Sequence, residues 1–234
     1  MTKPKIMIWD LETTNLKGNM GHILTAAACW AGEDECFSWN INRVPGYGMT
    51  PASYIDDSSI VRDLIDMMNE SDATVAHYGQ RFDLRFLHTR ALVHGIDVPA
   101  PVKLIDTWRY ARDKLALTSN RLETLASFLN SEHQKYKLPL EAWTLAQHGD
   151  PDILREMEEY CINDVLTLEE VYLKLRPLIH DHPYSVEGDR TSCPACGSKK
   201  VQRRGYRRTK AFKIERWNCT ECGSWYSGKQ QKVR

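Results

Sequence analysis

Long apolar runs are missing from this sequence of 234 residues. No stretch of about 18 consecutive apolar residues occurs, so the sequence gives no sign of a transmembrane helix. The apolar residues near the N-terminus are interrupted by Asp10 and Glu12, which does not fit a signal peptide. Internal repeats and low-complexity segments are missing as well. We therefore expect a soluble, cytoplasmic protein of prokaryotic or phage type.

A disulfide framework is also not expected, because the seven cysteines are an odd number and no secretory signal accompanies them. Cys29, Cys36 and Cys161 are scattered along the chain and are expected to be packing residues. The remaining four cysteines are regularly spaced and have a different meaning, which is discussed below.

Net charge is zero over the whole chain, but the charges are unevenly placed. Residues 191–234 contain 12 lysines and arginines and 2 acids, so residues 1–190 contain 19 basic and 29 acidic residues. The C-terminal part therefore has a net charge of +10 and the rest −10. This asymmetry indicates a basic appendage that binds a polyanion such as a nucleic acid, although a merely solubilising tail would have the same composition.

The order of predicted elements indicates an α/β fold with a mixed sheet. Three apolar segments, residues 5–9, 23–31 and 35–39, predict strands, and the Gly-containing residues 32–34 predict a hairpin turn between the last two. Helices and strands then alternate, and residues 40–57 are expected to form a long loop. The segments expected after this loop are helix 58–71, strand 73–77, helix 83–94, strand 102–106 and helices 107–113 and 120–130.

The strongest helical pattern covers residues 150–179, with Asp150 as the N-cap and Pro151 at the first helical position. Its apolar stripe comprises Leu154, Met157, Cys161, Val165, Leu168, Tyr172 and Leu175. The polar residues that follow predict a domain boundary. We expect a catalytic domain at residues 1–181, a linker at 182–191, a small β module at 192–228 and a basic tail at 229–234.

Acidic residues follow the first predicted strand. Asp10 and Glu12 are two residues apart, so their side chains lie on the same side of the strand. Two adjacent carboxylates repel each other, and burying them is costly unless a cation neutralises them. A hard divalent cation such as Mg²⁺ or Mn²⁺ suits these ligands, although an ordinary pair of surface acids would give the same spacing.

Two later segments place acids in comparable positions. Asp83 follows Phe82 where a helix is expected to begin, and there a carboxylate also simply stabilises the helix N-terminus. Tyr160 and Asp164 are four residues apart on the long helix and share one of its faces. A tyrosine at the core edge with a solvated aspartate would explain the second pattern without any chemistry.

Taken together, these segments resemble the DEDDy family of 3′–5′ exonucleases, which includes polymerase proofreading domains and has a ribonuclease H-like fold. The resemblance covers roughly residues 5–180. It implies that Asp10, Glu12, Asp83 and Asp164 hold two divalent ions, Mg²⁺ or Mn²⁺, that clamp the scissile phosphate. A sister subfamily has a histidine five residues before the last aspartate, where this chain has Glu159, so the tyrosine subclass is favoured.

The resemblance also assigns positions around the metals. Tyr160 would orient the attacking water, and with an ordinary phenol pKa of about 10 it is a poor base by itself. Leu11, Thr13 and Phe82 are implied as nucleic-acid-binding residues, the first two in the pocket of the terminal nucleotide and Phe82 as a support of the following turn. Tyr78 departs from the family, which often has asparagine there, and this affects how the substrate backbone is held.

Asp106 also ends a predicted strand. It is either a fifth carboxylate of the site or the N-cap of the next helix, and we favour the N-cap.

Two Cys-x2-Cys-Gly sequences lie in the basic C-terminal part. Cys193 and Cys196 form the first, and Cys219 and Cys222 form the second. Four thiolates in this spacing are typical of a tetrahedral, structural Zn²⁺ site. A module of this size has little core, so the metal is expected to supply folding free energy.

The segment between the cysteine pairs is basic and aromatic, and it resembles the zinc ribbons of transposases and other nucleic-acid proteins. Gly205 and Tyr206 predict the turn of a basic hairpin. Phe212 and Trp217 are expected in the small core of the module and Tyr206 on its surface. The expected nucleic-acid-binding residues of the module are Arg203, Arg204, Tyr206, Arg207 and Arg208.

These patterns favour an enzyme that removes nucleotides from a 3′ end, with DNA favoured over RNA and a single-stranded end expected. The ribbon would raise the local concentration of substrate. Two alternatives remain at this stage, a non-catalytic nucleic-acid-binding adaptor and a structure-specific endonuclease on the same scaffold.

Overall fold

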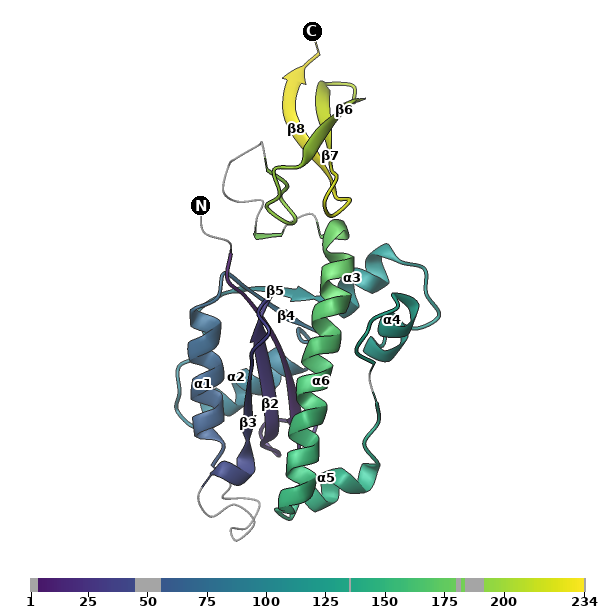
Figure 1. The fold of residues 1–234 in the computed structure, drawn as a ribbon. Helices are drawn as coiled ribbons and strands as arrows, with labels where there is room; N and C mark the ends of the chain where they lie inside the picture. Colours follow the sequence, from purple (N-terminus) through teal and green to yellow (C-terminus); the bar gives the residue numbers. More distant parts are fainter. Residues whose placement is uncertain (1–3, 45–55, 135, 180–181, 184–191, 234) are drawn as a thin grey trace. The chain divides into compact units, whose positions relative to one another are not determined.

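The computed structural model describes residues 4–44, 56–134, 136–179, 182–183 and 192–233 (Figure 1). Contacts within the chain divide it into two units, Lys5–Tyr172 and Leu173–Arg234 with Met1–Pro4. Most of the expected linker at 182–191 and of the expected loop at 40–57 lies outside the described residues. Among the residues described, none of the helices combines the length and apolar character of a membrane span.

The larger unit contains a five-stranded sheet with the strand order β3-β2-β1-β4-β5. Its first three strands are antiparallel neighbours, and β4 and β5 run parallel to β1. The mixed sheet predicted from the sequence is therefore confirmed. Its strands are β1 (Ile6–Thr13), β2 (Ile23–Trp30), β3 (Cys36–Asn40), β4 (Ala73–Ala76) and β5 (Lys103–Asp106).

Helices cover both faces of this sheet, which explains why every residue of β2 is buried. In Figure 1, α6 runs in front of the sheet, while α2 lies behind it. The helical elements in chain order are η1 (Ile41–Arg43), α1 (Ser58–Asn69), α2 (Asp83–Val93), α3 (Thr107–Lys114), α4 (Leu122–Phe128), α5 (Leu140–Gln147), α6 (Pro151–Leu175) and η3 (Arg176–Leu178). The predicted helices are present, and α5 is a helix that the sequence pattern did not predict.

Helix α6 begins as predicted, because the side chain of Asp150 accepts hydrogen bonds from the backbone N–H groups of Asp152 and Ile153. All members of its predicted apolar stripe are buried. Polar contacts fix its position along the sheet. The carboxylate of Glu158 accepts hydrogen bonds from Ser38 and Asn40, and Asn40 also donates to the backbone carbonyl of Leu154 at 2.8 Å.

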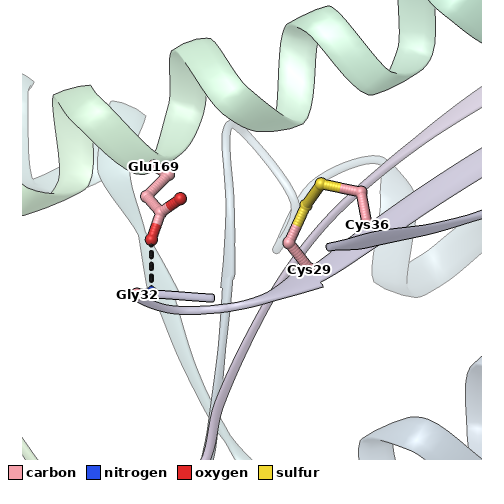
Figure 2. The surroundings of a disulfide bond; sticks show 4 residues. All are labelled: Cys29, Gly32, Cys36 and Glu169. Atoms are coloured by element: carbon pink, nitrogen blue, oxygen red, sulfur yellow. Dashed lines mark hydrogen bonds between the residues drawn. A yellow bond between two sulfur atoms is a disulfide. The ribbon is translucent and has the colours of Figure 1, made fainter. Parts of the chain in front are cut away.

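The hairpin of β2 and β3 contradicts one expectation. Cys29 and Cys36 form a disulfide rather than acting as separate packing residues (Figure 2). They lie directly opposite each other in the antiparallel register, with Cα atoms 4.4 Å apart. The argument from an odd number of cysteines was wrong here, because it did not separate this pair from the four regularly spaced cysteines. Of the three scattered cysteines, only Cys161 is a free, buried packing residue.

The turn of this hairpin is also tied to α6. The backbone N–H of Gly32 donates to Glu169 at 2.7 Å, which Figure 2 shows beside the disulfide. Gly32 has a φ of 81°, as expected for the Gly-containing turn.

A buried ion pair joins the segments behind the sheet. Arg90 of α2 contacts the carboxylate of Asp57 at 2.7 Å, and Asp57 also accepts from the backbone N–H of Ile23 at the start of β2. The guanidinium further donates to the carbonyl of Gly18 in the loop after β1. These charged hydrogen bonds satisfy groups that would be costly to bury unpaired.

The smaller unit contains a separate antiparallel sheet of β6 (Val201–Arg208), β7 (Phe212–Cys219) and β8 (Trp225–Lys232). The small β module predicted from the sequence is therefore present, and β8 includes residues 229–232 of the expected tail. Gly205 does not form the hairpin turn. It has a φ of 80° at an irregularity inside β6, and the turn lies between Thr209 and Phe212.

The core of this module differs from the expectation. Ile214 and the zinc-ligand candidate Cys219 are the buried residues of β7, whereas Phe212 is 38 % exposed. Trp217 is half-buried and stacks on Tyr226, with ring centroids 6.5 Å apart. Tyr206 is 40 % exposed, which confirms its expected place on the surface. Phe212 lies on the same side of β7 as Ile214, and it is exposed because it is the first residue of the strand, directly after the turn.

Candidate active site and metal centre

Three of the predicted acids lie together between β1 and α6. Asp10 and Glu12 point to the same side of β1, since this strand continues through both residues to Thr13. Asp164 extends from α6. One carboxylate oxygen from each of the three lies within 4.8 Å of the others. Asp164 is 1 % exposed, so this negative charge is concentrated at a place with little access to water.

Asp83, the fourth predicted acid, is not one of the three in this group, and the buried thiol of Cys161 lies next to Asp10. Burial raises the pKa of Cys161 well above its ordinary value, and the charges of Asp10, Glu12, Asp164 and Asp83 raise it further, in that order. All four predicted carboxylates therefore act on one buried side chain. The Cys161 sulfur also lies 3.5 Å from the backbone oxygen of Asp10, which makes it a direct contact between α6 and β1.

Asp83 is positioned by the turn between β4 and α2. It is the first residue of α2 and is 3 % exposed. A Cβ added to Gly79 in this turn would stand 2.4 Å from the Cβ of Ala76 and 3.7 Å from the Asp83 carboxylate. Glycine is therefore needed at residue 79 for the turn to lie this close to β4.

Asp106 fixes the same turn. As favoured from the sequence, it caps α3 through the backbone N–H of Arg109. Its two oxygens also accept hydrogen bonds from the backbone N–H groups of Tyr78 and Gln80, at 3.0 and 3.2 Å. Asp106 thus ties the end of β5 to the chain segment that leads into Asp83.

Tyr160 lies one helical turn before Asp164 and is 5 % exposed. Its ring is enclosed edge-to-face by Tyr136, at a centroid distance of 5.2 Å, and by Trp143, at 6.4 Å. Burial raises the pKa of Tyr136, and the charges of Glu159, Glu156 and Asp164 raise it further. Two aromatic side chains therefore fix the orientation of Tyr160 beside the acids.

The other predicted residues of this region occupy three different settings. Leu11 is 4 % exposed and packs in the core cluster. The hydroxyl of Thr13 donates to the backbone carbonyl of Asn15 at 2.9 Å. Phe82 packs against Phe86 with ring centroids 5.8 Å apart, directly before Asp83.

The acidic cluster suits a hard divalent cation. Carboxylates held within 4.8 Å of one another repel strongly when all are charged, and a cation that takes oxygen ligands offsets this repulsion. Asp10, Glu12 and Asp164 are therefore the residues that would hold such an ion.

The four regularly spaced cysteines also converge. Their sulfur atoms all lie within 4.8 Å of one another, with Cys193 and Cys222 at 3.6 Å and Cys196 and Cys219 at 3.7 Å. Tetrahedral zinc with Zn–S bonds of about 2.3 Å requires sulfur atoms about 3.8 Å apart. Burial raises the pKa of Cys193 to about 11 and that of Cys196 further. A cation that binds thiolates would stabilise these closely packed sulfur atoms. The spacing of the four cysteines predicted as ligands suits zinc.

The predicted nucleic-acid-binding residues of the ribbon all come from β6. Arg204, Arg207 and Arg208 are exposed. Arg203 lies 3.6 Å from Glu215 and donates to the hydroxyl of Tyr206 at 3.2 Å. The amino group of Lys213 lies 4.0 Å from the centre of the Tyr206 ring.

Several residues of the site were not identified from the sequence. Tyr136 and Trp143 come from segments without a chemical motif, and only the fold brings them to Tyr160. Cys161 was recognised as part of an apolar stripe, and nothing in that stripe indicates its contact with Asp10.

The sheet order and the acids at its centre define a ribonuclease H-like nuclease fold. A family model described as the RNase_H superfamily matches residues 7–176, and the chain belongs to this superfamily. This membership supports a nuclease-type function that processes nucleic acid.

Comparison with solved structures gives the same fold. The chain is similar to a family B DNA polymerase from the hyperthermophilic archaeon Pyrobaculum calidifontis, with 14 % sequence identity and a TM-score of 0.59. The similarity covers 79 % of this chain and 26 % of that one, so this chain corresponds to about a quarter of the polymerase. No curated protein matched.

The thiol geometry predicts one zinc ion per chain of the purified protein. Cys219→Ala removes a ligand and is expected to abolish stoichiometric zinc, because the remaining three thiolates leave a tetrahedral site incomplete. Metal content measured by plasma mass spectrometry tests this. The control is Cys29→Ser with Cys36→Ser, which is expected to retain zinc. Equal zinc in the Cys219→Ala protein would contradict the assignment.

Proposed function

We propose that this protein is a divalent-metal-dependent 3′–5′ exonuclease, and that its zinc ribbon binds the nucleic acid. DNA is the favoured substrate. The observation that carries the proposal is the convergence of Asp10, Glu12 and Asp164, with Tyr160 one turn from Asp164 on α6. These residues are among those on which the resemblance to DEDDy exonucleases rests.

The chain's own groups have distinct tasks in this proposal. The four carboxylates would bind two Mg²⁺ or Mn²⁺ ions, which when bound supply a Lewis acid for the phosphate and a nucleophile at neutral pH. Tyr160 holds the attacking water through its hydroxyl. Its enclosure by Tyr136 and Trp143 supports this task, because a positioned group loses little freedom on binding.

We assign binding of the nucleic-acid strand to the ribbon, because the charge of the ribbon is opposite to that of the acidic site. Residues 191–234 carry the net charge of +10, and the exposed arginines of β6 belong to this group. Arginines neutralise phosphates, and exposed aromatic rings stack on bases without regard to sequence. Besides Tyr206, Trp225 offers such a ring, with Arg216 at 4.8 Å from its centre.

Asp164→Asn tests the catalytic assignment. The substitution keeps the size of the side chain and removes a charge on which cation binding depends, so we expect at least about a hundredfold loss of activity. Digestion of 5′-labelled single-stranded DNA and RNA with Mg²⁺, Mn²⁺ or chelator is the measurement, and products shortened stepwise from the 3′ end are expected. Asp152→Asn, which changes an exposed acid on the same helix, is the control.

Three outcomes would contradict the proposal. Full activity of the Asp164→Asn protein would refute the assignment of the site. Cleavage of a circular strand would indicate an endonuclease, because an exonuclease has no end at which to start. A wild-type protein that digests neither DNA nor RNA with either metal would indicate a non-catalytic binding protein.

Arg204→Gln with Arg208→Gln tests the ribbon. Each phosphate contact contributes about 0.7 to the slope of log affinity against log salt for a single strand, so this slope should fall by about 1.4. Fluorescence anisotropy of a labelled oligonucleotide at several salt concentrations measures it. The matched control is Arg62→Gln with Arg155→Gln, two exposed arginines of the larger unit. An unchanged slope in the ribbon variant would exclude these arginines from the interface.

A further inference from the structure

Two aromatic and two arginine side chains form a cluster beside the turn that carries Asp83. The rings of Tyr78 and Trp108 meet edge-to-face, with centroids 4.9 Å apart. The guanidinium of Arg112 lies 4.8 Å from the centre of the Trp108 ring. Arg81 lies 6.0 Å from the centre of the Tyr78 ring and 5.8 Å from that of Trp108. These four side chains are called the aromatic–arginine patch below.

One buried carboxylate holds both segments that form this patch, the turn with Tyr78 and Arg81 and the helix with Trp108 and Arg112. Asp106 is 4 % exposed and accepts hydrogen bonds from the backbone of Tyr78 and of Gln80, which precedes Arg81. The same carboxylate caps α3, the helix that carries Trp108 and Arg112. The two halves are therefore held in a fixed relation by a group that lies below the surface.

The backbone conformation of Tyr78 is not explained by packing of its side chain in the core. Its φ is 66°, a left-handed value that is uncommon for a bulky residue. Its side chain is nevertheless 37 % exposed, so core packing does not account for the strained backbone. Strain of this kind is found most often where a protein holds a ligand.

The patch is positively charged. It presents two arginines in the part of the chain, residues 1–190, that has a net charge of −10. Arg112 contacts the adjacent Asp113 at 2.9 Å, and both side chains are exposed. Such a surface pair contributes little free energy, so it leaves the guanidinium available to a phosphate.

We propose that the aromatic–arginine patch binds the single-stranded nucleic acid next to its 3′-terminal nucleotide. Tyr78 stacks on a base, and Arg81 and Arg112 contact phosphates. The patch adjoins the acidic site, since the turn residue Gly79 lies beside the Asp83 carboxylate. The inference rests on the proposed function for the identity of the ligand. At residue 78, where the DEDDy family often has the amide of an asparagine, this chain would use the aromatic ring of Tyr78.

Two single variants of the full chain test this inference. Tyr78→Asn removes the ring and keeps a residue that tolerates the left-handed conformation. Arg112→Gln removes one cation from the surface. The controls are Phe37→Asn, which changes another exposed ring, and Arg155→Gln, which changes another arginine paired with a nearby acid. Thermal unfolding of each variant shows whether the fold is retained.

The first measurement is anisotropy of labelled oligothymidylate in buffer without Mg²⁺ or Mn²⁺, and without a chelator that would remove zinc from the ribbon. Loss of one stacked base or one phosphate contact is expected to weaken binding about tenfold in each patch variant and to leave both controls at the wild-type affinity. Equal affinity of the patch variants and the wild type would overturn the inference. This measurement needs no turnover, so it also decides the question if the protein digests no substrate and the proposed function fails.

The second measurement separates stacking from a purely structural role. Abasic nucleotides are placed one at a time along the strand. In the wild type, one position near the 3′ end is expected to lower affinity more than its neighbours, and the Tyr78→Asn protein should lose this difference. If Tyr78→Asn weakens binding but keeps the full position-dependent penalty, Tyr78 does not stack on a base and the inference is refuted.

Discussion

Repulsion among the carboxylates of Asp10, Glu12 and Asp164 is the constraint on which the site depends. Left to themselves, these groups would move apart or take up protons, since neither burial nor proximity favours their charges. The apolar stripe of α6 and the hydrogen bonds that Glu158 makes to β3 hold Asp164 against β1. Packing free energy thus maintains an arrangement that only a bound cation makes electrostatically favourable.

The two clusters that could hold a metal ion follow different rules of ligand choice. Oxygen ligands at the end of a sheet suit Mg²⁺ or Mn²⁺, which exchange with solvent and substrate, whereas four thiolates enclose Zn²⁺ completely. The acidic site is built from β1, α2 and α6, elements distant in sequence, and a large apolar core supports it. The four cysteines of the ribbon lie in and beside two tight turns, and Ile214 is the buried apolar residue of its central strand, so a zinc ion held there would take the place of a core.

Many features of the fold and of the acidic site were predictable from the sequence, because they depend on local patterns. The stripe of α6, the caps at Asp150 and Asp106 and the strand that carries Asp10 and Glu12 are all set by residues close in sequence. The features that were predicted wrongly or missed depend on strand register and on contacts between residues distant in sequence. Cys29 meets Cys36 only through the exact pairing of β2 with β3, and Phe212 is exposed because β7 begins at this residue, directly after a turn whose place was not predicted. Neither the enclosure of Tyr160 by Tyr136 nor the bonds from Asp106 to the Tyr78 turn has a local signature.

Anomalous diffraction from crystals soaked in Mn²⁺ tests whether the three carboxylates hold a cation, because it locates the ion without reference to activity. We expect a manganese peak bounded by the carboxylates of Asp10, Glu12 and Asp164, and its loss in crystals of the Asp164→Asn protein. Saturating Mn²⁺ that leaves these carboxylates without a peak, or that binds there equally well in the variant, would contradict this expectation.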